Sequence, residues 1–207
     1  MKIIGLTGGS GSGKTAVSKV FSENGIYCID ADKVVARLYE DEYFLQLLTR
    51  SFGEKIMCDG VVKKSLVSKL VFENKEELQL LNEICLPYVI SKLKNTISNE
   101  KARGIDVVCL DGATIIESGF YKECDVVVAV SADYDMRLDR ITKRDNVTTE
   151  TAKNRIAAQP ENEFYEKYAH IVIKNDCGFD DFIRKAKTAA DIIMSLNGNH
   201  GGKTVYV

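Results

Sequence analysis

The residues Gly8-Gly9-Ser10-Gly11-Ser12-Gly13-Lys14-Thr15 fit the pattern G-x-x-x-x-G-K-[ST] at every fixed position. Residues 2–7 (KIIGLT) before them have the apolar composition of a short buried strand, and residues 16–24 (AVSKVFSEN) after them have helical apolar spacing. A glycine-rich loop in this setting points backbone N–H groups at anionic oxygens, and the helix N-terminus adds its positive dipole end. The sequence therefore predicts a phosphate-binding loop in which Lys14 reaches the β- and γ-phosphates and the Thr15 hydroxyl ligates Mg²⁺.

The composition is that of an ordinary globular chain. It has 207 residues, of which 45% are hydrophobic and 28% charged, with a net charge of −2, so no basic field favours a nucleic-acid partner. No apolar run approaches the ~20 residues of a membrane-spanning helix, and we expect a cytoplasmic protein without a membrane partner. Six cysteines without C-x-x-C spacing indicate reduced structural thiols: Cys28, Cys58, Cys85, Cys109, Cys124 and Cys177.

Strand and helix patterns alternate along the chain, except between residues 41 and 99, where apolar spacing indicates helices interrupted at Gly53, Asp59-Gly60 and Pro87. This order predicts an α/β protein with a doubly wound, five-stranded parallel sheet and a helical insertion. The expected strands are residues 2–7, 25–29, 105–110, 125–130 and 169–173. The expected parts are a core of residues 1–39, 104–134 and 168–196, an insertion of about 40–103, a segment of about 135–165, and a loosely held Gly/Asn-rich tail within 197–207.

Two aspartates, Asp30 and Asp32, directly follow the second expected strand. A carboxylate beside an acceptor hydroxyl can orient it and take its proton during phosphoryl transfer. Aspartate is also a favoured helix N-cap, and Asp32 directly precedes a helical run. The pattern leaves both interpretations open for each aspartate, including the arrangement in which one caps the helix and the other acts as the base.

Asp111 ends the third expected strand in the run VVCLD. Apolar residues followed by a terminal carboxylate resemble the Walker B arrangement, in which the carboxylate meets Mg²⁺. The alternative is an aspartate that turns the chain together with Gly112. The phosphate-binding loop favours the first interpretation.

Residues 137–144 (RLDRITKR) are dense in cations, and Thr148 or Thr149 is placed to cap a further helix. A charge run of this kind is commonly a solvated helix face. In a phosphoryl-transfer enzyme, Arg140 and Arg144, one helical turn apart, can form a lid that neutralises charge on the transferred group. Arg155 is a third candidate, and spacing does not choose among the three arginines.

Taken together, these segments resemble the dephospho-CoA kinase family. The resemblance covers the chain almost from end to end. Its matching segments are GLTGGSGSGKT at 5–15, IDADKVVARLY at 29–39, FG at 52–53, DG at 59–60, VF at 71–72, LLNEI at 80–84, IIESGFYKECD at 115–125, RLDRITKRDNVTTE at 137–150, AAQ at 157–159 and VIKN at 172–175.

The resemblance implies a P-loop kinase fold with a helical domain for the substrate and a helical lid. It implies that ATP, with Mg²⁺ at Thr15 and Asp111, phosphorylates the ribose 3′-hydroxyl of dephospho-CoA, and that the protein is a monomer or small homo-oligomer. Asp32 is then the general base, with Lys14 and Arg140 as the other catalytic residues. The implied ATP-binding set is Thr7, Gly8, Gly9, Ser10, Gly11, Ser12, Gly13, Lys14, Thr15, Ala16, Arg144 and Asn175.

Departures from the family pattern gather in the substrate half. Leu86 stands where the family has His, Ala113-Thr114-Ile115 where it has Pro-Leu-Leu, Lys63-Lys64 where it has Asp-Arg, and His170 where it has Asp. ATP binding is therefore better supported than substrate identity. Two alternatives stay open, namely a related P-loop kinase for another small hydroxyl or phosphate acceptor, and an ATP-binding adaptor that transfers nothing.

Overall fold

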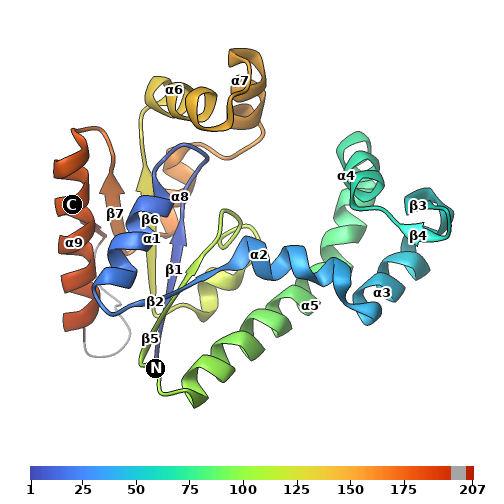
Figure 1. Ribbon diagram of the computed structural model, residues 1–207, viewed down its shortest axis with the longest axis horizontal. Helices are drawn as coiled ribbons and strands as arrows, with labels where there is room; N and C mark the ends of the chain where they lie inside the picture. Colours follow the sequence, from blue (N-terminus) through green and yellow to red (C-terminus); the bar gives the residue numbers. More distant parts are fainter. Residues whose placement is uncertain (197–203) are drawn as a thin grey trace. The chain divides into compact units, whose positions relative to one another are not determined.

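The computed structural model of the protein describes residues 1–196 and 204–207 (Figure 1). The Gly/Asn-rich tail expected at 197–202 lies outside the described residues. The chain divides into two compact units, Met1–Asp30 with Glu100–Val207, here the core unit, and Ala31–Asn99, here the helical unit. No helix in the described ranges combines the length and apolar character needed to cross a bilayer.

The core unit is built on a fully parallel sheet with the strand order β2-β5-β1-β6-β7-β8. The five predicted strands are all present, and the predicted doubly wound α/β class is confirmed. Their bounds are β1 Lys2–Thr7, β2 Tyr27–Asp30, β5 Val107–Asp111, β6 Val126–Ser131 and β7 Ile171–Lys174.

The sheet has one strand more than the sequence predicted. This strand, β8 (Val205–Tyr206), extends the edge of β7. The backbone N–H of Val205 donates to the carbonyl of His170 at 2.9 Å, and that of Val207 donates to Val172 at 3.0 Å. Two residues are too short for a recognisable alternation, so main-chain pairing at an open sheet edge, rather than a side-chain pattern, forms this strand.

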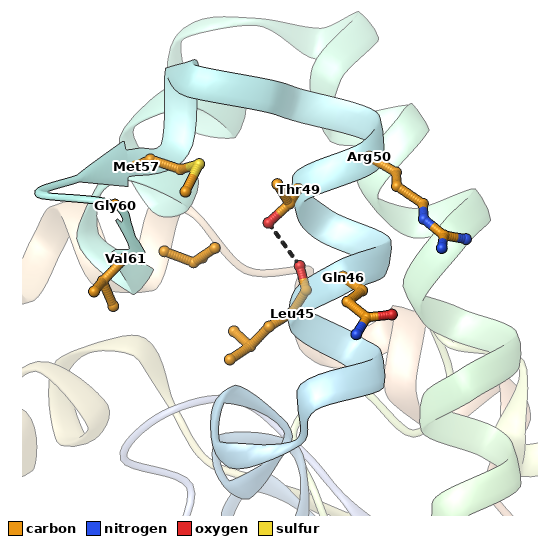
Figure 2. Close-up of a pocket in the computed structure, with 8 residues that line it drawn as sticks. Leu45, Gln46, Thr49, Arg50, Met57, Gly60 and Val61 are labelled. Atoms are coloured by element: carbon orange, nitrogen blue, oxygen red, sulfur yellow. Dashed lines mark hydrogen bonds between the residues drawn. The ribbon is translucent and has the colours of Figure 1, made fainter.

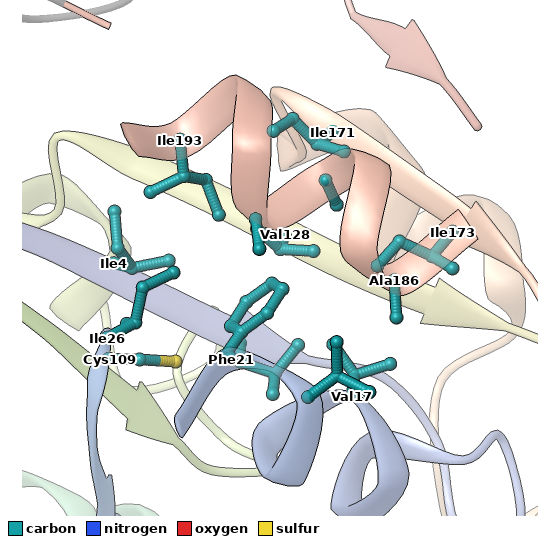
Figure 3. Packing of buried hydrophobic residues seen from close by; sticks show 14 of the residues in the cluster. Ile4, Val17, Phe21, Ile26, Cys109, Val128, Ile171, Ile173, Ala186 and Ile193 are labelled. Atoms are coloured by element: carbon teal, nitrogen blue, oxygen red, sulfur yellow. The ribbon is translucent and has the colours of Figure 1, made fainter. Parts of the chain in front are cut away.

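Helices cover both faces of the sheet. On one face α1 (Lys14–Glu23) and α9 (Phe179–Ser195) lie side by side, and on the other lies α8 (Asn162–Tyr168) (Figure 1). Figure 3 shows the larger apolar core between the sheet and the first two helices, with Ile4, Val17, Phe21, Val128, Ala186 and Ile193. Burial on both faces explains the nearly continuous apolar strands, which hold the phosphate-binding loop on a rigid base.

Two helices follow β6. They are α6 (Tyr134–Asp145) and α7 (Thr149–Ala157), and Ile141, Ala152 and Ile156 form the apolar contact between them. The hydroxyl of Thr148 caps α7 by accepting from the backbone N–H of Thr151 at 3.2 Å. Of the two candidate caps, Thr148 and Thr149, the cap is therefore Thr148. A short 3₁₀ helix, η3 (Phe120–Glu123), lies between β5 and β6.

The helical unit has its own apolar core around Phe44, Leu48, Phe52, Ile56 and Val67. Its elements are α2 Ala31–Ala36, η1 Arg37–Glu40, α3 Glu42–Phe52, η2 Gly53–Ile56, β3 Met57–Cys58, β4 Val61–Val62, α4 Lys64–Glu73 and α5 Lys75–Ala102. The last residues of α5, 100–102, belong to the core unit.

The expected helix interruption at Pro87 is wrong, because α5 continues through this proline. Proline removes one helical hydrogen bond and costs about 3 kcal/mol in a helix interior. Ile84, Cys85 and Tyr88 on either side pack into the core of the helical unit, and the Tyr88 ring stacks on Phe44 with 5.8 Å between centroids. This packing stabilises the helix despite the proline.

The helical region also contains a hairpin that the sequence analysis did not predict. Asp59 and Gly60, interpreted as an interruption between helices, join the antiparallel strands β3 and β4. Both have positive φ, 53° and 74°, as the two central residues of a type I′ turn require. An Asp-Gly pair is a known hairpin signal, but each flanking strand has only two residues and so shows no alternation.

Candidate active site

The phosphate-binding loop runs from the end of β1 to the start of α1, as predicted. Gly13 has a φ of +112°, and a Cβ there would lie 2.5 Å from Asn175 Nδ2 and 2.9 Å from the Phe182 ring, so only glycine fits. Among the described residues no side chain caps α1, whose first backbone N–H groups therefore face the loop. The Lys14 ammonium donates to the Gly8 carbonyl at 2.8 Å, which holds this cation against the loop. These groups form a cradle for anionic oxygens.

Two other polar side chains of the predicted ATP set are fully buried. Thr7 donates to the backbone carbonyl of Ala113 at 3.3 Å, so its hydroxyl joins β1 to the loop after β5. Ser12 Oγ has no hydrogen-bond partner in the part of the chain that the structure describes. A buried hydroxyl in the phosphate-binding loop is a donor suited to an anionic ligand. Contact of either residue with ATP stays a prediction.

Asp30 and Asp111 lie directly opposite each other at the carboxyl ends of β2 and β5, where Asp111 is also in register with Leu6 of β1. Neighbouring strands are about 4.8 Å apart, so two carboxylates stand together at the edge from which the phosphate-binding loop leaves the sheet. Carboxylate and hydroxyl oxygens suit Mg²⁺, which is commonly held by one or two carboxylates and phosphates. The described residues contain no cluster of three His, Cys, Asp or Glu side chains that could hold a metal ion.

Asp32 does not precede a helix as an N-cap would, because α2 begins one residue earlier at Ala31. Asp32 lies in the first turn of α2, which belongs to the helical unit. Asp32 is therefore not the N-cap of α2. The role of general base for Asp32 stays a prediction.

Arg140 joins α6 to the phosphate-binding loop. Its guanidinium donates to the Gly11 carbonyl at 3.3 Å and to Asn175 Oδ1 at 3.0 Å. Asn175 Nδ2 in turn donates to the Ser12 carbonyl at 2.7 Å. The structure thus brings four predicted residues from three distant segments into one hydrogen-bonded group.

Arg144 and Arg155 meet elsewhere, on the carboxylate of Asp145. Arg144 donates to both oxygens, at 2.7 and 3.0 Å, and Arg155 donates to Oδ2. The hydrogen bonds from Arg144 lower the pKa of Asp145. The three candidate arginines therefore fall into two groups, with Arg140 on the loop and the other pair at the turn between α6 and α7.

A cleft of about 590 Å³ opens between the phosphate-binding loop and α6. This volume lies in the range of small-molecule sites, and its charged walls carry four cations and one carboxylate, as an anionic nucleotide requires. Its lining residues are Gly11, Gly13, Lys14, Thr15, Ala16, Asp139, Arg140, Lys143 and Arg144. Six of the predicted ATP-binding residues thus line one cleft, together with Arg140.

The sequence analysis missed three polar residues near the loop. Arg137 donates to the Ser10 carbonyl at 2.9 Å, and Gln159 accepts from the Ser10 N–H at 2.8 Å. Glu117 lies near enough to Lys14 for its charge to act, since partial desolvation raises the pKa of Glu117 and the Lys14 charge opposes that rise. All three occur in segments already singled out, namely 137–144, AAQ and IIESG, but nothing in those patterns shows their contacts.

The helical unit holds a separate, mainly apolar pocket of about 420 Å³. Figure 2 shows it between α3 and the β3–β4 hairpin, with the side chains of Leu45, Gln46, Thr49, Arg50, Met57 and Val61 around it. The Thr49 hydroxyl donates to the Leu45 carbonyl at 2.9 Å, so its hydrogen is already used within α3. This wall suits an apolar group rather than a phosphate.

The departures from the family pattern have local structural roles. His170 Nδ1 accepts from the backbone N–H of Val127 at 3.0 Å and so joins β6 to the start of β7. The Lys64 ammonium lies 5.5 Å from the centroid of the Tyr39 ring, a cation–π contact. Leu86 and Pro87 line a groove on α5. None of these roles prevents nucleotide binding by the core unit.

A sequence model of the dephospho-CoA kinase family matches residues 2–181. The chain belongs to the dephospho-CoA kinase family. The dephospho-CoA kinase of Fusobacterium nucleatum is 36% identical over 192 residues, which cover 92% of this chain and 98% of that protein. The Arabidopsis thaliana dephospho-CoA kinase is 34% identical over 184 residues, covering 87% and 79%.

Solved structures show the same fold. The Thermus thermophilus protein TT1252 superposes with a TM-score of 0.77 at 27% identity, covering 95% of this chain and 98% of that one. Dephospho-CoA kinase from Campylobacter jejuni has a TM-score of 0.67 at 21% identity, covering 93% and 98%, and shows the shared fold. The predicted family, its kinase activity with ATP, and the P-loop kinase fold are therefore confirmed.

Proposed function

We propose that this protein transfers the γ-phosphoryl group of ATP to the ribose 3′-hydroxyl of dephospho-CoA, with Mg²⁺. The observation that carries the proposal is the hydrogen-bonded group of Arg140, Asn175 and the phosphate-binding loop, which lines a nucleotide-sized cleft in a chain of this family. The alternative of an ATP-binding adaptor has no such support, because the family is one of enzymes. A kinase for another small acceptor stays the alternative that the test addresses.

The loop binds the triphosphate through the backbone N–H groups at the start of α1 and through Lys14. Phosphoryl transfer depends chiefly on positioning and on stabilising charge, and Arg140 supplies a cation at the wall of the cleft. Thr15 and Asp111 would hold Mg²⁺, which when bound neutralises charge on the phosphates. The lid helices α6 and α7 would exclude water during transfer.

Asp32 would take the proton of the 3′-hydroxyl as the new bond forms. Asp30, which is in register with Asp111, would act near Mg²⁺ rather than as the base. The helical unit would receive dephospho-CoA, with its apolar pocket as a candidate for the pantetheine arm. A cytoplasmic location and a monomeric or small homo-oligomeric state stay predictions from the sequence.

Turnover of dephospho-CoA, adenosine and the common nucleoside monophosphates, each with Mg²⁺ and ATP, tests the proposal. We expect a kcat/KM for dephospho-CoA at least about 10²-fold above that for every other acceptor, because truncated substrates lose remote binding energy. The position of the new phosphate is read by NMR of the product. A larger kcat/KM for a nucleoside monophosphate, or a phosphate on another hydroxyl, would assign a different kinase reaction.

A further inference from the structure

Arg137 and Gln159 together hold the peptide of Ser10 from outside the phosphate-binding loop. Arg137 lies near the start of α6, and Gln159 lies after α7. Arg137 Nε donates to the Ser10 carbonyl at 2.9 Å, and Gln159 Oε1 accepts from the Ser10 N–H at 2.8 Å. Arg137 Nη2 also donates to Gln159 Oε1 at 3.5 Å. Both backbone polar groups of one loop residue are therefore satisfied by two linked side chains.

The loop packs directly on this arginine. A Cβ on Gly9 would lie 2.8 Å from Arg137 Cζ, and one on Gly11 would lie 2.8 Å from the Arg137 carbonyl oxygen. The pattern G-x-x-x-x-G-K-[ST] requires only Gly8 and Gly13. The two additional glycines of this chain are thus explained by the close approach of the loop to Arg137.

No salt bridge neutralises the charge of Arg137 within the described residues, although Glu161 and Glu163 line the same pocket as this arginine. The Arg137 side chain is buried, with the residue only 4% exposed, and within residues 1–196 and 204–207 it forms no ion pair with a carboxylate. Its two hydrogen-bond acceptors, the Ser10 carbonyl and the Gln159 amide, are neutral. Burial lowers the pKa of this guanidinium, and the neighbouring Tyr165 and Tyr134 oppose that shift. A buried cation without a counter-ion favours an anion close by.

We infer that Arg137 is a positioning residue for phosphoryl transfer, which with Gln159 fixes the Ser10 peptide and with its unpaired charge strengthens phosphate binding from beneath the loop. The inference rests on the proposed use of this loop for ATP. In a purely structural role, only the hydrogen bonds of Arg137 would matter, and the lack of an ion-pair partner would have no effect on phosphate binding. The inferred role of Arg137 also differs from that of Arg140, which lines the cleft itself.

The substitution Gln159→Glu separates these roles, because glutamate has the shape of glutamine and its oxygen can accept both hydrogen bonds. It supplies Arg137 with the carboxylate that it lacks. We expect the melting temperature to stay the same or rise, and the Kd for inorganic tripolyphosphate, measured by calorimetry, to increase about tenfold or more. The KM for ATP should increase similarly, while the KM for dephospho-CoA stays unchanged.

Asn154→Asp is the matched control. It introduces the same charge change on α7, at an exposed position that contributes to no part of the loop. We expect wild-type affinity for tripolyphosphate, since an exposed charge is screened by salt. Arg137→Lys is the second variant: it keeps the charge but loses the planar fork, so it should lower the melting temperature and weaken tripolyphosphate binding less than Gln159→Glu does.

Wild-type affinity for tripolyphosphate in folded Gln159→Glu would overturn the inference and leave Arg137 a structural residue. A control variant weakened as much as Gln159→Glu would overturn it as well, since net charge alone would then explain the effect. If the wild-type protein bound tripolyphosphate but phosphorylated another acceptor, the proposed substrate would fail while the inference on Arg137 stood. Binding of tripolyphosphate therefore tests the arginine, and acceptor turnover tests the function.

Discussion

Arg140 donates to the side-chain oxygen of Asn175 at 3.0 Å, which ties α6 to the loop that follows β7. The Asn175 side chain also donates to the Ser12 carbonyl at 2.7 Å and is only 5% exposed. One amide thus uses its acceptor to orient the Arg140 cation and its donor to hold the phosphate-binding loop. The positions of Arg140 and of the phosphate-binding loop therefore both depend on this bridging residue.

Asn175→Leu should lower activity by disrupting this bridge. Leucine has a similar volume but satisfies neither the Ser12 carbonyl nor Arg140, so we expect a loss of about 2 kcal/mol in stability and a KM for ATP about tenfold higher. Thermal denaturation and steady-state kinetics measure the two effects. Asn175→Asp keeps the acceptor for Arg140 but not the donor for Ser12, and an unchanged KM in both variants would contradict the assignment.

Lys14→Ala should reduce kcat by about 10²-fold or more, because its ammonium contributes to the charge that stabilises the transferred phosphoryl group. Lys19→Ala is the matched control, since Lys19 is exposed on the same helix and, within the part of the chain that the structure describes, pairs only with Glu23 at 4.0 Å. We expect Lys19→Ala to retain wild-type kinetics. Near-normal turnover by Lys14→Ala would remove this lysine from the phosphate cradle.

Asp32→Asn should leave the Kd for ATP close to the wild-type value and lower kcat by about 10²-fold or more, in line with general-base contributions. Asp30→Asn distinguishes the two aspartates. Because Asp30 is in register with Asp111, we expect its loss to change the Mg²⁺ dependence of the rate. Single-turnover kinetics at several Mg²⁺ concentrations measures the rates of both variants. Full turnover by Asp32→Asn would exclude Asp32 as the base.

The helical unit should lose stability in acid, because Asp41 then becomes protonated. Asp41 caps α3 by accepting from the Phe44 N–H at 3.1 Å and pairs with the Lys92 ammonium at 2.8 Å. The hydrogen bond from Lys92 and then that from Phe44 lower its pKa to about 2. Since the folded-state pKa is below the unfolded value of about 3.9, this stabilisation is present above pH ~4 and is lost as the pH falls toward 2.

Asp41→Asn tests this pH dependence. We expect its melting temperature to be lower than that of the wild type by a few degrees at pH 7, with the difference shrinking between pH 4 and 2. Glu23→Gln is the control, because the exposed Lys19–Glu23 pair contributes little at any pH. A difference in melting temperature that stays constant over this range would show that the charge of Asp41 does not matter.

Local patterns were sufficient for the elements that carry the site. The phosphate-binding loop, the five main strands and the two helices after β6 were all predicted, because each depends on neighbouring residues: glycines at a turn, apolar runs buried on both faces, and Thr148 as a cap. The sequence analysis placed Asp30 and Asp111 at strand ends, but their direct pairing in register became visible only in the folded sheet.

The remaining features depend on residues that are distant in the chain. Spacing did not distinguish Arg140 from Arg144 and Arg155, because the difference lies in the partners, Asn175 for the first and Asp145 for the other two. The same holds elsewhere: α5 continues through its proline because of packing against α3, and β8 exists because β7 offers an open edge. The lack of an ion-pair partner for the buried Arg137 is visible only once α6, α7 and β1 are folded together. Burial and ion pairing depend on contacts between distant segments and not on sequence order.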